Sequence, residues 1–315
     1  MMELGQANQI VFADTLLELA KQDGDVLVVT SDSRGSGKLV SFGEFLPAQI
    51  VEVGIAEQNL VGISAGLAST GKKVFAVSPA CFVTTRSLEQ IKNDIAYSDN
   101  PVKVIGISAG VSYGALGSTH HSLHDFAALR AINNIDIVAP ADNFETREAV
   151  KAFLAYPTPI YMRLGKRPMA NLHTSDAVFE IGKAITIRDG IDLTFICIGE
   201  PTSRAVEAAE VLQEEGISCR VISMHTLKPF DEDALLTAAA ETRAIITVEE
   251  HSVYGGLGER VSSLLTAHNQ CIPLKIVGIP DEYTVTGSQT EIFDHYGISR
   301  DGLAASAREL LKSIS

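Results

Sequence analysis

The chain has 315 residues, of which 46% are hydrophobic, enough for about two folded domains with sizeable cores. It carries 25 lysines and arginines against 39 aspartates and glutamates, and the net charge of −14 argues against nucleic acid as its main partner. We expect neither a signal peptide nor a membrane span, since no suitable apolar run is present. The four cysteines lack metal-binding spacing, which indicates reduced core thiols of a cytoplasmic protein.

Short apolar runs alternate with amphipathic segments along the first half of the chain. Apolar residues between Ile10 and Ala20 share one helical face, and Asp142 followed by Glu145 resembles a capping box that begins another helix. The apolar runs are typical of strands buried on both faces of a sheet. They lie at residues 26–30, 50–53, 74–78, 102–107, 135–139 and 160–164. The alternation predicts a mostly parallel sheet covered by helices.

The pattern is interrupted between Lys166 and Ser175, where the absence of periodicity is typical of a linker. The alternation of strand and helix patterns then resumes at residues 193–198, 205–212, 219–223, 233–240, 245–248 and 257–265. We therefore predict an α/β protein of two doubly wound domains, at residues 1–172 and 173–315.

The segment Val53–Asn59 (VGIAEQN) follows an apolar run and precedes a helical pattern. Open α/β sheets bind ligands at the carboxyl ends of their parallel strands, which is where this segment lies. Glu57 has apolar neighbours there, and a carboxyl group in such surroundings suits acid–base chemistry near neutral pH. The alternative is an exposed first-turn glutamate that the helix dipole stabilises.

A histidine-rich segment, Gly117–Asp125 (GSTHHSLHD), follows the run at residues 102–107. His120 and His124 have the spacing of a metal-binding pair on a helix, but the glycines before them favour a loop, and further ligands are missing nearby. A contact between His120 and a substrate or phosphate is the better functional interpretation. A loop without function is the alternative.

Two other places could bind an anion. Residues 32–38 (DSRGSGK) offer backbone N–H groups, a hydroxyl group and two cations without the residue order of a P-loop, and Arg163 ends a predicted strand. Lone arginines in such places more often form surface ion pairs. Residues 248–258 (VEEHSVYGGLG) join a strand to a helix in the second half, and a structural turn is favoured there over an active loop.

In this order, the segments resemble the C-terminal half of a transketolase. VGIAEQNLVGISAGLA resembles the family segment whose glutamate faces the aminopyrimidine of thiamine diphosphate. GSTHHSLHD resembles the family's G-[PA]-T-H-Q segment, and EEHSVYGGLG resembles a turn in its C-terminal domain. The resemblance covers essentially the whole chain, and it implies a pyrimidine-binding domain at 1–172 followed by a transketolase C-terminal domain at 173–315.

The family's diphosphate-binding domain contains a GDG segment that helps to hold Mg²⁺ or Ca²⁺ and the diphosphate, and this chain contains no GDG. The resemblance therefore implies one subunit of a split transketolase, inactive alone and without metal ligands of its own. The partner subunit would supply the missing domain in a heterotetramer of two plus two. Such an enzyme transfers a two-carbon ketol unit between sugar phosphates.

The resemblance also assigns roles to individual residues. Glu57 matches the catalytic glutamate, which bonds the pyrimidine ring nitrogen and so promotes removal of the thiazolium C2 proton. Phe82 matches a ring that packs against the pyrimidine, and Pro79 replaces a second aromatic residue. Sugar or phosphate contacts are matched by His120, Ser36 and Arg163.

Three positions depart from the family pattern. Leu116 stands where the family has an aspartate that accepts a hydrogen bond from a donor hydroxyl, and Ser108 stands where a histidine helps to hold the substrate. Asn8 or Gln9 stands where an arginine adds to the phosphate site. We therefore expect an unusual or branched ketose phosphate as the donor.

Two other interpretations stay open. The chain could be half of another thiamine-dependent enzyme, either a 2-oxo acid dehydrogenase β subunit or a synthase resembling deoxyxylulose-phosphate synthase. GSTHH argues against the first, and the single-chain organisation of the synthase argues against the second. A non-catalytic partner of a transketolase subunit would need neither Glu57 nor His120, yet both are present.

Overall fold

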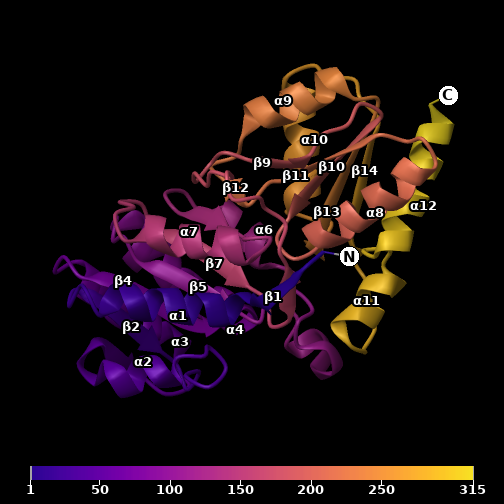
Figure 1. The fold of residues 1–315 in the computed structure, drawn as a ribbon. Helices are drawn as coiled ribbons and strands as arrows, with labels where there is room; N and C mark the ends of the chain where they lie inside the picture. Colours follow the sequence, from indigo (N-terminus) through magenta and orange to yellow (C-terminus); the bar gives the residue numbers. More distant parts are fainter. Residues whose placement is uncertain (1, 315) are drawn as a thin grey trace.

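The computed structural model describes residues 2–314, which form two halves that each contain a central sheet (Figure 1). The elements of the first half are β1 (Leu4–Ala7), α1 (Asn8–Ala20), β2 (Val26–Thr30), α2 (Val40–Phe45), β3 (Ile50–Glu52), α3 (Glu57–Ala68), β4 (Lys73–Pro79), α4 (Ala80–Arg86), α5 (Leu88–Gln90), β5 (Lys103–Ile107), α6 (Asp125–Arg130), β6 (Asp136–Val138), α7 (Asn143–Phe153), β7 (Ile160–Leu164) and β8 (Pro168–Ala170). Those of the second half are β9 (Ile185–Arg188), β10 (Leu193–Ile198), α8 (Thr202–Glu214), β11 (Cys219–Ser223), β12 (Thr226–Lys228), α9 (Glu232–Glu241), β13 (Ile245–Ser252), α10 (Leu257–Ala267), β14 (Leu274–Ile279), α11 (Gln289–His295) and α12 (Arg300–Ser313).

The larger sheet has the strand order β12-β6-β7-β5-β4-β2-β3. Its neighbouring strands are parallel except at one edge, where β12 from the second half pairs antiparallel with β6. Strands β5 and β7 are buried along their whole length. Because both faces of these strands are covered by the rest of the protein, their sequences are mostly apolar rather than alternating, apart from Lys103 and Arg163. The edge strand β12 also joins the two halves through backbone hydrogen bonds.

The second sheet has the order β14-β13-β10-β11-β9 and is parallel except for the pairing of β9 with β11. One core of this half combines residues of α8 and α12 with residues of β10, β11 and β13, and Phe195, Leu212 and Leu303 are fully buried in it. Helix α10 packs against β13 and β14 and contributes its buried residues to a different core cluster. A separate antiparallel pair, β1 with β8, lies beside the second half. Figure 1 shows the helices of both halves arranged around their sheets.

These sheets confirm the predicted α/β class. The predicted strands at 26–30, 160–164, 193–198 and 219–223 have the observed bounds. Asp142 begins α7 as predicted, because its carboxylate accepts the N–H of Glu145 at 3.0 Å. The carboxylate of Glu145 bonds the N–H of Ala141 rather than that of Asp142, so the capping box is incomplete. The domain boundary at residue 172 stays a prediction.

Two predictions from the sequence were wrong in detail. The segment between Lys166 and Ser175 is not irregular throughout, since it contains β8, whose three residues are too few to show a period. Met169 of β8 is buried, which explains why the strand forms. Three of the four cysteines are buried as expected, but Cys271 is exposed.

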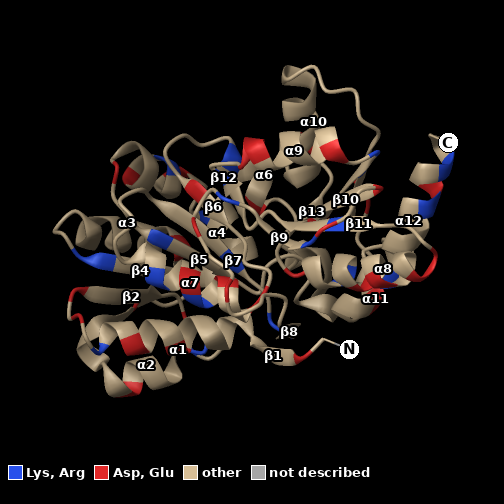
Figure 2. Cartoon of the chain, turned by 45° about the horizontal axis from the view of Figure 1, so that its top comes forward, with Lys and Arg blue, Asp and Glu red and all other residues tan. Residues whose placement is uncertain are grey.

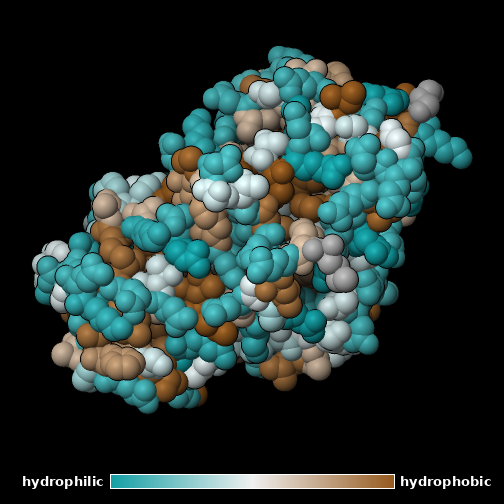
Figure 3. Space-filling model, in the orientation of Figure 1, coloured by the Kyte–Doolittle hydropathy of each residue, from teal (hydrophilic) through white to brown (hydrophobic). Residues whose placement is uncertain are grey.

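Charged side chains of both signs occur on the helices of both halves, and Figure 2 shows them dispersed. In the space-filling view, hydrophobic surface gathers near the middle of the molecule, between the two lobes, and in smaller areas of the lower-left lobe (Figure 3). Within residues 2–314 no helix is long and apolar enough to cross a membrane.

Candidate active site

Four segments singled out from the sequence meet at one edge of the larger sheet. Residues 32–38 follow β2, Glu57 begins α3 after β3, Phe82 lies in α4 after β4, and His120 lies in the loop after β5. These strands are parallel neighbours in the order β5-β4-β2-β3, so their carboxyl ends share an edge. Ligands of open α/β sheets bind at this edge.

Glu57 is buried at the first position of α3, where the helix dipole favours a negative charge. Its Oε1 accepts a hydrogen bond from Nη1 of Arg86 at 2.9 Å, and the Arg86 side chain is 49% exposed. The guanidinium carbon of Arg86 lies 4.3 Å from the centroid of the Phe82 ring. A buried carboxylate paired with a half-exposed cation can exchange that cation for a polar group of a ligand.

Ring contacts continue from Phe82 across the site. The rings of Phe82 and His120 meet edge to face with centroids 5.4 Å apart, and those of His120 and Tyr113 do the same at 5.3 Å. Nζ of Lys166 lies 4.4 Å from the centroid of the Tyr113 ring, which is a cation–π geometry. The contacts form one continuous surface, the active-site wall, made of Glu57, Arg86, Phe82, His120, Tyr113 and Lys166.

Ser108 and Ser36 are linked through the buried amide of Gln9. With its oxygen toward Ser108, this amide accepts hydrogen bonds from the backbone N–H (2.9 Å) and Oγ (3.0 Å) of Ser108, and its NH₂ group donates to the Ser36 carbonyl at 3.1 Å. Ser108 has a φ of +55° and no exposed surface, whereas Ser36 is exposed. Burial raises the pKa of Tyr113, and a hydrogen bond with Ser108 opposes that effect. Ser108 therefore lies behind the active-site wall and supports it.

Leu116 lies on the tip of the loop that carries His120. The tip is a 3₁₀ segment, Gly114–Thr119, with a kink at Gly117 where φ is +69°. The side chain of Leu116 is 55% exposed. An apolar group thus stands on the exposed tip of the segment that positions His120.

Arg163 lies near the end of β7, as predicted, but its side chain is enclosed by acidic groups. Its side chain is 7% exposed, Nη1 donates to Oδ1 of Asp125 at 3.1 Å, and Nη2 donates to the carbonyl of Glu250 at 2.9 Å. Burial alone would lower the pKa of Arg163, but Asp125 and Glu250 hold it above its ordinary value. These carboxylates neutralise the guanidinium inside the protein, so the structure does not support the predicted phosphate contact. Lys166, by contrast, is exposed.

The residues present fit one end of thiamine diphosphate. Its aminopyrimidine needs an acidic partner for a ring nitrogen and an apolar surface for the ring face, and Glu57 and Phe82 offer these side by side. When bound, this cofactor supplies the nucleophilic carbon for ketol transfer. Within residues 2–314 no group of three or more His, Cys, Asp or Glu could hold a metal ion. The pair His120 and His124 is therefore not part of such a group.

Sequence reasoning missed three residues of the active-site wall. Arg86 lies four residues after Phe82, and Tyr113 lies seven residues before His120. Neither of them belongs to a motif quoted in the sequence analysis. Lys166 was assigned to a linker. The signal that could have found Lys166 is its place two residues beyond β7, the neighbour of β5 at the ligand-binding edge.

Proteins of known family resemble this chain along nearly its whole length. Residues 6–170 match the transketolase pyrimidine-binding domain family, and residues 182–303 match the transketolase C-terminal domain family. One relative, a subunit of the apulose-4-phosphate transketolase of Phocaeicola vulgatus, is 52% identical over 96% of both chains. The corresponding apulose-4-phosphate transketolase subunit of Actinobacillus succinogenes is 34% identical over 95% of this chain and 97% of that one.

A solved structure of a split-gene transketolase, described as an "inactive beta4 tetramer", superposes with a TM-score of 0.89. It is 33% identical and covers 98% of this chain and 99% of its own. The two family matches together span most of the chain, and the relatives match it almost end to end. The chain belongs to the transketolase family, as the subunit of a two-subunit transketolase that carries the pyrimidine-binding and C-terminal domains.

Proposed function

We propose that this subunit transfers a two-carbon ketol unit from a branched ketose phosphate, and that it works with a partner subunit that holds the diphosphate and the Mg²⁺ or Ca²⁺ ion. The observation that carries the donor proposal is the exposed Leu116 on the tip of the loop that carries His120, four residues before His120 in the chain. Leucine accepts no hydrogen bond, so a donor hydroxyl placed against it would lose a partner. Two relatives whose names specify apulose 4-phosphate support this donor class.

Five of the six residues of the active-site wall have a place in this function. Glu57 would leave Arg86 and hold a proton on the pyrimidine ring nitrogen, while Phe82 packs against the ring face. His120 would bond the ketose oxygens. Lys166, rather than the buried Arg163, is the cation we assign to the terminal phosphate, with Ser36 as a second contact.

The reaction exchanges one carbon–carbon bond for another without net oxidation. The C2–C3 bond of the ketose breaks, and the two-carbon unit forms a new bond to the aldehyde carbon of an acceptor sugar phosphate. In apulose 4-phosphate C3 bears no hydrogen, so its release gives a ketone, dihydroxyacetone phosphate, rather than an aldose phosphate. That product distinguishes a branched donor from xylulose 5-phosphate.

We further propose a heterotetramer of two chains of each kind, because the two ends of the cofactor are assigned to different chains. The description of the similar split-gene structure as an inactive tetramer is in keeping with a subunit that needs its partner. Obligate interfaces of this kind are large and apolar.

The test is a donor screen with the reconstituted complex. The two subunits, thiamine diphosphate and Mg²⁺ are mixed with an aldose phosphate acceptor, and release of dihydroxyacetone phosphate from apulose 4-phosphate is followed by a coupled assay. We expect a kcat/KM for apulose 4-phosphate at least ~10-fold above that for xylulose 5-phosphate, from the lost hydrogen bond at Leu116. Equal or reversed efficiencies would contradict the donor proposal.

A further inference from the structure

The loop between β5 and α6, residues 108–124, is called the His120 loop. Its two ends are drawn together at the base, where the N–H of Ser122 donates to the carbonyl of Gly110 at 2.8 Å. The tip between them carries Leu116 and His120. The residues that clamp this base come from the second half of the chain, in the segment 250–252 at the end of β13.

Glu250 holds the first residues of the loop. Its Oε1 accepts hydrogen bonds from the backbone N–H of Val111 and from Nε2 of Gln289, both at 2.8 Å. Glu250 is only 4% exposed, and Gly110 is so close that a Cβ there would lie 2.2 Å from the Glu250 carboxyl carbon. The side chain therefore fits against the backbone at the point where the loop leaves β5.

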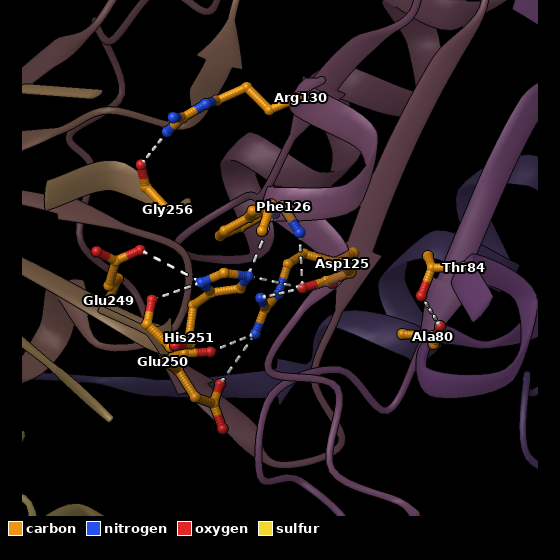
Figure 4. Close-up of polar contacts among 12 residues, drawn as sticks. Ala80, Thr84, Asp125, Phe126, Arg130, Glu249, Glu250, His251 and Gly256 are labelled. Atoms are coloured by element: carbon orange, nitrogen blue, oxygen red, sulfur yellow. Dashed lines mark hydrogen bonds and ion pairs between the residues drawn. The ribbon is translucent and has the colours of Figure 1, made fainter. Parts of the chain in front are cut away.

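The last residues of the loop are held by the next residues of the same segment. The N–H of Ser252 donates to the carbonyl of Leu123 at 3.1 Å. The Nδ1 of His251 lies 2.7 Å from the Ser252 carbonyl, which leaves Nε2 to accept the N–H of Ala127 at 3.5 Å. Figure 4 shows the ring of His251 directed toward Asp125 across the boundary between the halves.

The tip also rests on the second half. Gly114 has a φ of +51°, and a Cβ on it would lie 2.7 Å from the carbonyl oxygen of Gly287, just before α11. Gln289 in the same turn also bonds Glu200, at 2.8 Å. One buried network thus runs from α11 through Gln289 and Glu250 to the backbone of the His120 loop.

We propose that Glu250 is a positioning residue for ketose binding, which acts through the hydrogen bond between its carboxyl group and Val111. The C-terminal domain thereby sets where His120 and Leu116 lie. This inference rests on the proposed function, since His120 matters here as a ketose contact. The segment EEHSVYGGLG is then more than a structural turn of its own domain.

The hydrogen bond between Glu250 and Val111, rather than the charge of the Glu250 carboxyl group, positions the loop. The guanidinium of Arg163 is closer to Asp125, at 3.1 Å, than to the carboxylate of Glu250, at 3.7 Å, so it keeps a counter-charge without Glu250. Burial, followed by the nearby Glu200, raises the pKa of Glu250. The amide oxygen of glutamine can accept the Val111 N–H with a side chain of the same length, whereas the aspartate side chain is one methylene group shorter and does not reach Val111.

The experiment compares Glu250→Asp with Glu250→Gln in the assembled two-subunit complex. Hydrogen–deuterium exchange of peptides covering residues 110–124 is measured together with the KM for apulose 4-phosphate and the affinity for thiamine diphosphate. In Glu250→Asp we expect about 3- to 10-fold faster loop exchange and a KM raised by a similar factor, the scale of one lost hydrogen bond. Cofactor affinity should stay constant, and Glu250→Gln should keep most of the wild-type behaviour.

Glu249→Gln is the matched control. Glu249 is the preceding residue and is equally buried, but its carboxylate bonds the N–H groups of Leu257 and Gly258 at the start of α10. It should leave exchange of the His120 loop unchanged. If Glu250→Asp does not assemble, Gln289→Leu serves as the second variant, because it removes one hydrogen bond to Glu250 Oε1 and should loosen the loop to a smaller extent.

The results separate the positioning role from the proposed function. Loop exchange that rises in Glu250→Gln as much as in Glu250→Asp, or that rises in neither, overturns the inference. Faster hydrogen–deuterium exchange of the loop in Glu250→Asp without a change in the KM for the ketose also overturns the inference, provided that His120→Ala does raise that KM. If His120→Ala leaves that KM unchanged, the proposed ketose contact has failed, and the inference fails with it for a separate reason.

Discussion

Glu57 at the start of α3 and Glu250 near the end of β13 are both buried glutamates, but their surroundings give them opposite roles. The partner of Glu57 is the half-exposed Arg86, which can move aside for a ligand. Glu250 is enclosed by the N–H of Val111, the amide of Gln289 and the guanidinium of Arg163. A buried carboxylate is free for chemistry when its partner is replaceable, and it organises structure when its partners are fixed.

The largest effect is expected at Glu57. Glu57→Gln keeps the size of the side chain but cannot hold a proton on the pyrimidine nitrogen, and general acid–base contributions are ~10²–10⁴-fold in rate. We expect a loss of kcat in that range, while assembly with the partner subunit survives, as size-exclusion chromatography would show. Activity near that of the wild type would mean that Glu57 is only a first-turn carboxylate.

The next effect concerns donor choice and tests the apolar tip of the His120 loop. Leu116→Asp restores an acceptor for a donor hydroxyl, and one such hydrogen bond is worth ~1–3 kcal/mol when its absence leaves a buried group unpaired. The ratio of kcat/KM for xylulose 5-phosphate over apulose 4-phosphate should rise by roughly 5- to 150-fold. An unchanged ratio would show that another group selects the donor. Leu4→Asp, an exposed leucine on β1, is the control.

Lys166 contrasts with Arg163 as a cation at the same edge of the sheet. Lys166→Gln removes a charged contact to the donor phosphate, and we expect a KM about 10-fold higher with little change in kcat, since charged hydrogen bonds contribute ~1.5–3 kcal/mol. Lys151→Gln on the outer surface of α7 should change neither constant. If the KM of Lys166→Gln equals that of the wild type, a residue other than Lys166 binds the donor phosphate.

The last effect concerns stability rather than activity, and it is a pH dependence that arises from Glu250. Its pKa is raised to about 8 in the folded chain, first by burial and then by Glu200, whereas an unfolded glutamate titrates near ~4.3. The carboxyl group of Glu250 therefore stays protonated to a higher pH in the folded state than in the unfolded state. Its contribution to the free energy of unfolding is complete below pH ~4.3 and is lost as the pH rises to about 8.

Glu250→Gln cannot titrate, so it supplies the reference. Urea unfolding at pH 5.5 and pH 8 should show the wild type losing stability relative to Glu250→Gln as the pH rises, by up to about 1.4 kcal/mol per pH unit. A difference that stays constant, or that grows in favour of the wild type, would contradict the raised pKa.

Local patterns in the sequence predict much of the fold and half of the site. Strand runs such as 160–164 and the motif around Glu57 depend on neighbouring residues, and both are found where expected. Arg163 shows why the rest was missed: its partners Asp125 and Glu250 are 38 and 87 residues away in the chain. Only the packing of the second half on the first reveals that this arginine is neutralised.

Lys166 shows the converse case. Its position beyond β7 places it on the active-site wall, but that follows from strand order, and strand order is set by long-range pairing that no local pattern contains. The position of Ser108 also depends on a long-range contact. Its backbone has a φ of +55°, and its hydroxyl group is hydrogen-bonded to the side chain of Gln9, a residue 99 positions away in the chain.

The central claim is that this chain holds one half of a shared active site. The most direct measurement is ketol transfer from apulose 4-phosphate, with thiamine diphosphate and Mg²⁺ present, by each subunit alone and by an equimolar mixture. We predict activity in the mixture and none above background in either subunit alone. Transfer catalysed by this chain without its partner would contradict the claim.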